Sequence, residues 1–106
     1  MITGIHADVD TAALGRPLQA LIFIRIHSGS REELEKEADR LAELTPVLHV
    51  LFLGGHCDFV VWAALADPAE LRKFVLEDLS RDRAIANTET CVIMEHRRGQ
   101  AFDLTN

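Results

Sequence analysis

The sequence predicts a single α+β domain whose strands and helices follow the order β-α-β-β-α-β. Three observations predict this order. Three segments are predominantly apolar and a fourth is rich in β-branched residues, two segments repeat apolar residues at helical spacing, and a short glycine-containing turn joins the middle two strands. An apolar content of 48% in 106 residues is enough for the packed core of one domain.

The first 17 residues are predicted to form a linker strand and a turn, ahead of a domain over residues 18–106. Ile5, Ala7 and Val9 would share one face of a short strand over residues 2–9. Gly15 would stop a single helical turn. A segment this short cannot bury itself, so we expect it to lie on the domain or on a partner chain.

The first long strand is predicted over residues 18–26, and the first helix follows it. The residues expected on one face of the strand are Ala20, Ile22, Ile24 and Ile26. Leu18, Leu21 and Phe23 would make the other face partly apolar. The segment Ser30 to Glu33 has the pattern of a capping box at a helix start. The buried stripe of this helix is predicted to consist of Leu34, Ala38, Leu41 and Ala42.

A β-hairpin is predicted over residues 47–66, with strands at 47–53 and 59–66 joined by the turn from Gly54 to Asp58. Paired glycines take the positive φ that tight turns need, and Asp tolerates it better than most residues. This turn holds glycine amides, an imidazole, a thiol and a carboxylate within five residues. A small-molecule site is therefore expected near it.

The second helix is predicted to start at Asp67, with Pro68 at its first position and Glu70 at its third. Its expected buried stripe consists of Leu71, Phe74, Val75 and Leu79. The fourth strand is predicted over residues 87–95. The complete order is the split βαβ arrangement of ferredoxin-like folds.

Two helices can cover only one face of a four-stranded sheet, yet the strands are apolar on both faces, most clearly over residues 59–66. An antiparallel sheet with one wet face should alternate apolar and polar residues. The second face is therefore expected to meet another protein surface. The simplest partner is an identical sheet in a two-fold dimer, which gives a dimeric α+β barrel.

The net charge and the cysteines limit the classes of function and the cellular compartment that fit this chain. A net charge of −6 repels phosphate backbones and argues against direct nucleic-acid binding by this chain. Neither a signal peptide nor an apolar run near 18 residues is present, which favours a soluble, cytoplasmic protein without membrane contact. In that compartment Cys57 and Cys91 are expected to be free thiols.

Three segments together resemble the C-terminal, effector-binding (RAM) domain of the Lrp/AsnC family of bacterial and archaeal transcription regulators. Residues 2–5 and 14–18 are similar to the family's linker strand, 55–59 to its Gly-x-x-Asp-aromatic turn, and 88–95 to its last strand. The stretch that usually reads Leu-Pro-Gly-Val before that strand is Asp82-Arg83-Ala84-Ile85 here. Only 17 residues precede the first long strand, so DNA contact is expected only through a helix-turn-helix absent from this chain. The sequence leaves open whether the chain is a stand-alone domain or a fragment.

The resemblance implies a domain that senses a small molecule, in the family commonly an amino acid, and that forms dimers, which gather into tetramers or octamers. It implies a site near the Gly-x-x-Asp turn and the last strand, between dimers. The ligand-binding residues that it implies are Gly55, His56, Asp58, Cys91, Val92 and Ile93. Glycine lets backbone amides approach a carboxylate, and Asp58 could accept hydrogen bonds from an ammonium group. The alternative is that the Asp58 carboxylate satisfies the amides of its own turn.

Three other kinds of chemistry could use residues of this chain. A metal site could draw on His49, His56, Cys57 and Asp58, but these lack the paired spacing of metal ligands. Cys57 beside His56 suggests an activated nucleophile, yet neighbouring side chains point apart and no third group orients them. A dimeric α+β barrel enzyme resembling cofactor-free monooxygenases is the enzymatic alternative, although apolar strand faces offer little to line its pocket. We expect no catalytic residue, no cofactor and no metal.

Overall fold

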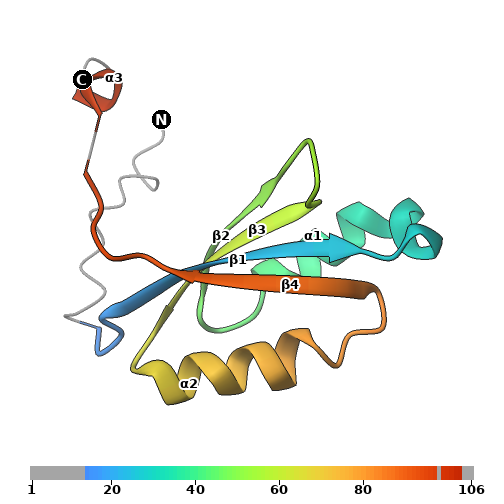
Figure 1. Ribbon diagram of the computed structural model, residues 1–106, viewed down its shortest axis with the longest axis horizontal. Coiled ribbons are helices and arrows are strands. Elements are labelled where there is room, and N and C mark those ends of the chain that lie inside the picture. The colour runs from blue at the N-terminus through green and yellow to red at the C-terminus, as the bar shows by residue number, and fades with distance from the viewer. Residues whose placement is uncertain (1–13, 98, 104–106) are drawn as a thin grey trace.

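The computed structural model describes residues 14–97 and 99–103 and shows a four-stranded antiparallel sheet with helices on one face (Figure 1). The strand order across the sheet is β2-β3-β1-β4. The strands are β1 (Leu18–Ile26), β2 (Val47–Phe52), β3 (Phe59–Leu65) and β4 (Ile85–Val92). The predicted α+β, ferredoxin-like order is confirmed.

Two helical segments cover the sheet, and a short helix lies near the C-terminus. A 3₁₀ helix, η2 (Ser28–Glu33), leads into α1 (Leu34–Ala42). After β3, α2 (Pro68–Lys73) continues without a break into a π-helix, η3 (Phe74–Leu79), and α3 (Gln100–Asp103) follows β4. None of the helices in the described residues is long and apolar enough to cross a membrane. The predicted linker strand over residues 2–9 lies outside the described residues.

The core lies between the sheet and the two helical segments. Alternate residues of β1 and β3 face the helices, as the strand period requires. Its buried strand residues are Ala20, Ile22, Ile24, Ile26, Phe59, Val61, Ala63 and Leu65. Leu41 of α1 and Leu79 of η3 close the other side and are fully buried. Leu18 was predicted on the opposite face and instead packs against this core, because it lies two residues before Ala20.

The two helices begin differently. At α2 the Asp67 Oδ1 accepts a hydrogen bond from the Glu70 N–H at 2.8 Å, and the Glu70 carboxylate accepts one from the Ala66 N–H at 3.3 Å. This capping confirms the predicted start of α2. For α1 the prediction was wrong, because a 3₁₀ helix occupies the predicted first turn and the α-helix begins at Leu34. Ala42, predicted in the buried stripe, is exposed at the end of α1.

The fourth strand is displaced from its predicted bounds, because its partner β1 decides where it can pair. It starts at Ile85, which pairs with Ile26, rather than at residue 87. It ends at Val92, and the Ile93 N–H makes the last contact, donating to the Gln19 carbonyl at 2.9 Å. Past Gln19, β1 has only its first residue, Leu18, left to pair, and Pro17 before it has no N–H to donate.

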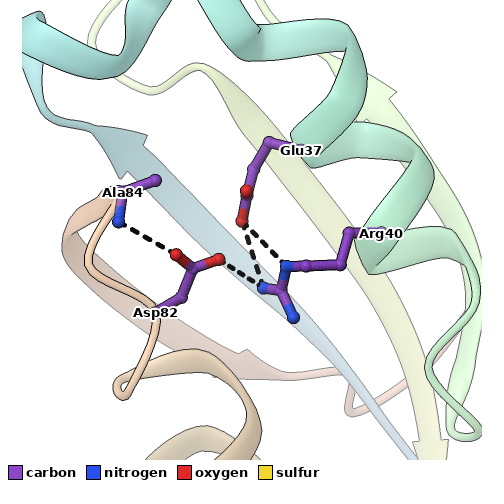
Figure 2. Close-up of polar contacts among 4 residues, drawn as sticks. All are labelled: Glu37, Arg40, Asp82 and Ala84. Carbon is purple, nitrogen blue, oxygen red and sulfur yellow. Dashed lines mark hydrogen bonds and ion pairs between the residues drawn. The ribbon is translucent and has the colours of Figure 1, made fainter.

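A cluster of Glu37, Arg40 and Asp82 joins α1 to the loop before β4 (Figure 2). Arg40 Nη2 lies 3.1 Å from Glu37 Oε2 and 2.6 Å from Asp82 Oδ2, the latter contact having ion-pair but not hydrogen-bond geometry. The Asp82 Oδ1 accepts a hydrogen bond from the Ala84 N–H at 2.9 Å. Two chain segments, α1 and the loop before β4, are thus joined through one cation.

The two carboxyls of this cluster titrate in opposite directions. Burial raises the pKa of Glu37 above its ordinary 4.5, and its hydrogen bond with Asp82 adds to the rise, which Arg40 only partly offsets. Burial also opposes ionisation of Asp82. Its hydrogen bonds with Glu37 and the Ala84 N–H, together with Arg40, nevertheless hold its pKa below 3.8. Glu37 therefore holds a proton to higher pH than an ordinary carboxyl, while Asp82 stays ionised.

Asp82→Asn is expected to lower the free energy of unfolding by about 1 kcal/mol at pH 7, because it removes the ion pair with Arg40. A depressed folded-state pKa stabilises the protein above the ordinary value, and that contribution disappears as pH falls through the folded value. The deficit of the variant should therefore shrink as the pH is lowered below 3.8. Urea unfolding across this pH range measures it, with exposed Asp78→Asn as control. A deficit that persists unchanged in acid would contradict the assignment.

Candidate functional site

The turn predicted to carry the site joins β2 to β3 and is exposed from Gly54 to His56. Gly55 has a φ of 132°, a backbone conformation that residues with an L side chain rarely adopt. Apart from its two chain neighbours, no described residue has an atom within 4 Å of the position that a Cβ would take there, so the backbone conformation and not crowding favours glycine. The Leu53 N–H donates to the Asp58 carbonyl at 2.9 Å and closes the turn.

Asp58 ends this turn and points into the protein, with only 7% of the residue exposed. Its Oδ2 accepts a hydrogen bond from the Ile26 N–H at 2.8 Å, and its own N–H donates to the Ile24 carbonyl at 2.9 Å. The carboxylate therefore anchors the turn to the end of β1. The amide that it satisfies belongs to the neighbouring strand, not to the turn itself.

The last-strand residues of the predicted site lie far from this turn within one chain. Cys91 pairs with Leu21 and Val92 with Ala20, whereas Asp58 lies beside Ile24 and Ile26. Three residue steps along β1 correspond to about 10 Å, and β1 itself lies between the two strands. Figure 1 shows the β2–β3 turn at one end of the sheet and the end of β4 at the other. The structure does not bring the two halves of the predicted site together.

Sequence reasoning missed a cavity between α2 and β4, on the helix side of the sheet. Its volume is about 400 Å³, and it is lined by Pro68, Leu71, Arg72, Val75, Leu76 and Thr90. The helical residues recur at three- and four-residue spacing, so they share one face of the helix. Thr90 pairs with Ile22 and shares its face of the sheet, as does Val92 two residues later. Leu76 is 52% exposed, which leaves the cavity open and apolar.

One signal in the sequence could have pointed to this cavity. The stretch from Leu71 to Leu79 carries one large apolar residue, Leu76, that the predicted buried stripe did not need. Of the predicted site residues, Val92 shares the cavity's side of β4 and is 43% exposed. Cys91 points to the opposite face of the sheet.

That opposite face, which carries no helix in Figure 1, holds a group of aromatic and apolar side chains. Trp62 donates its indole N–H to the Gln19 Oε1 at 2.8 Å, with ring contacts to His49 at 5.5 Å and His96 at 5.8 Å between centroids. Its other apolar members are Leu21, Phe23, Leu51 and Val60. We call this surface the open sheet face.

The two cysteines are free thiols, as predicted. Cys57 is partly buried and Cys91 is exposed. Within the described part of the chain, no three His, Cys, Asp or Glu side chains group as metal ligands would. His49 takes part in the open sheet face, whereas His56 lies in the exposed turn.

Comparison with known proteins settles the family. Residues 19–99 match the family model described as the Lrp/AsnC ligand binding domain. The chain belongs to the Lrp/AsnC family. The HTH-type transcriptional regulator AldR of Mycobacterium tuberculosis is 38% identical over 101 residues, which cover 95% of this chain and 56% of the relative. The Lrp/AsnC domain described here thus spans about half the length of the curated relatives it matches.

Solved structures of transcriptional regulators have the same fold. The crystal structure of AldR from M. tuberculosis superposes with a TM-score of 0.79 at 34% identity, over 92% of this chain and 67% of that one. A transcriptional regulator of Neisseria meningitidis in complex with L-methionine gives a TM-score of 0.75 at 21% identity, over 88% of this chain and 60% of the other. The sequence resemblance and the fold that it implied are confirmed.

Proposed function

We propose that this Lrp/AsnC domain senses a small molecule, with an amino acid as effector, and passes the signal to transcription through assembly. The observation that carries the proposal is the open cavity between α2 and β4. Apolar walls with a few polar groups are typical of small-molecule sites. The methionine complex of the Neisseria relative supports the effector class. The regulators among the relatives favour binding over the enzymatic alternative.

The proposed site is shared between protomers. The cavity lies at β4, one edge of the sheet, and the Gly55–His56 turn lies at the opposite edge, between β2 and β3. One effector can contact both only if the turn comes from another copy of the chain. In this proposal Asp58 holds the turn in position and Val92 lies beside the cavity's open end, whereas Cys91 and Ile93 face the other side of the sheet.

The proposed assembly begins with a dimer through the open sheet face, and such dimers gather into tetramers or octamers when turn and cavity meet. DNA contact is assigned to a helix-turn-helix outside the chain described here, as the HTH-type relatives suggest. The proposed place of action is the cytoplasm, where amino-acid pools are sensed.

One or more free amino acids are expected to raise the melting temperature, because a ligand that binds only the folded state stabilises it. At about 100 times Kd the gain is roughly 2.7 kcal/mol, a shift of several degrees for a domain of this size. Differential scanning fluorimetry with the twenty amino acids measures it. Thr90→Glu should abolish the shift, because it places a carboxylate in the cavity.

The matched control is Glu89→Gln, one residue earlier and on the opposite face of β4, which should keep the shift. Loss of the shift in both variants would mean that β4 itself, not the cavity, had been damaged. If no amino acid stabilises the wild type and an aromatic substrate is turned over with oxygen, the monooxygenase-like alternative is the better account.

A further inference from the structure

Among the described residues that line the cavity between α2 and β4, Arg72 is the one with a charged side chain. Arg72 forms no ion pair or hydrogen bond with any residue in the described part of the chain. Its neighbours three and four positions away on the helix are Pro68, Ala69, Val75 and Leu76, none of which is acidic. The guanidinium is thus available at the rim of an apolar cavity.

A guanidinium in this position binds a carboxylate best. A guanidinium matches a carboxylate with two parallel N–H···O bonds, and apolar surroundings strengthen the attraction compared with water. Thr90 adds a hydroxyl from the β4 side of the same cavity. Volume and polarity together fit a small carboxylate with an apolar side chain.

The α-amino group of an amino acid would find no carboxylate partner among the described lining residues of this cavity. None of the described residues that line the cavity is an Asp or a Glu. Asp58, the acidic residue of the turn in the proposed shared site, is buried in its own protomer and accepts a hydrogen bond from the Ile26 N–H. The ammonium of an amino acid would therefore meet no carboxylate that points into the cavity.

We propose that Arg72 selects the effector by its carboxylate and that the site does not require the α-amino group. Apolar 2-oxo acids are then effectors alongside the corresponding apolar amino acids. This inference rests on the proposed function, in which the α2–β4 cavity is the effector site. It makes the domain a sensor of both an amino acid and its deaminated form.

The test is isothermal titration calorimetry on the assembled protein. It compares two series of three probes, one series with the leucine side chain and one with the methionine side chain. The probes are L-leucine, 4-methyl-2-oxopentanoate and 3-methylbutylamine, and the methionine counterparts of these three. For the tighter-binding series, the oxo acid should bind within about tenfold of the amino acid, since its carboxylate contact is the same. The amine should bind at least about 100-fold more weakly, because it lacks the group that Arg72 recognises.

Arg72→Gln should weaken binding of the amino acid and the oxo acid by the same factor, about 30-fold or more, whereas Arg72→Lys should retain part of the affinity. The matched control is Lys73→Gln. Lys73 is the next cation on α2 but lines a separate groove with Arg16 and Glu70, so binding should not change. Melting temperature and elution volume establish that each variant is folded and assembled.

The outcomes separate this inference from the proposed function. If amino acids bind but their oxo acids do not, or if Arg72→Gln binds like the wild type, the inference is overturned while an amino-acid sensor stands. If Thr90→Glu also leaves amino-acid binding intact, the cavity is not the effector site and both fail. Parallel binding of amino and oxo acids, lost together in Arg72→Gln, supports the inference.

Discussion

Asp58→Ala is expected to lower the free energy of unfolding by about 2–3 kcal/mol, the cost of a buried amide left without its charged acceptor. The amide is that of Ile26 at the end of β1, a residue that is 3% exposed. For a domain of this size such a loss lowers the melting temperature by roughly 10–20 °C. Thermal and urea unfolding followed by circular dichroism measure the effect. Asp58→Asn should cost less, because the amide oxygen can still accept the hydrogen bond.

The control for this prediction is Asp39→Ala, which removes an exposed carboxylate from α1 and should change stability by less than about 0.5 kcal/mol. If Asp58→Ala unfolds like the wild type, the carboxylate does not anchor the turn. The Asn variant also tests the ligand-binding role predicted from the sequence. A folded Asp58→Asn protein that has lost its amino-acid response would show that Asp58 contacts the effector as well as β1.

The fold was predictable because its signals are local. β1 has its predicted bounds, Leu18–Ile26, since a long, mostly apolar run between Pro17 and a polar loop specifies a strand by itself. The start of α2 was equally readable from Asp67 and Pro68. The end of β4 was not, because it depends on where the partner strand starts, which no local pattern in β4 encodes.

The candidate site was harder to predict, because sequence patterns group residues that are close in the chain. The Gly55–Asp58 turn stood out for its dense polar chemistry, yet its carboxylate turned out to hold β1. The cavity combines one face of a helix with Thr90 of a strand that follows in the chain after a loop. Only the packing of α2 against β4 places Arg72 and Thr90 around the same space.

Phe23→Glu is expected to convert the proposed dimer into a monomer. Phe23 lies on the central strand β1 of the open sheet face, between Val60 on β3 and Glu89 on β4. In a sheet-to-sheet dimer the new carboxylate would be buried beside a like charge, Glu89, at a cost of several kcal/mol. The dimer dissociation constant should rise by more than about 100-fold. Sedimentation velocity or light scattering on a sizing column at micromolar protein measures it.

The matched control is Ala42→Glu, which adds the same charge at an exposed site on the helix side of the sheet and should leave the dimer intact. Phe23 is only partly buried in the single chain, so the monomeric variant should keep its fold and its circular dichroism spectrum. A variant that stays dimeric, or a wild type that is already monomeric, would mean that an apolar strand face does not by itself recruit a second sheet. The exposed Leu51 and the half-buried Leu21 and Trp62 would then need another protein surface to cover them, because an apolar patch of this kind marks an interaction site.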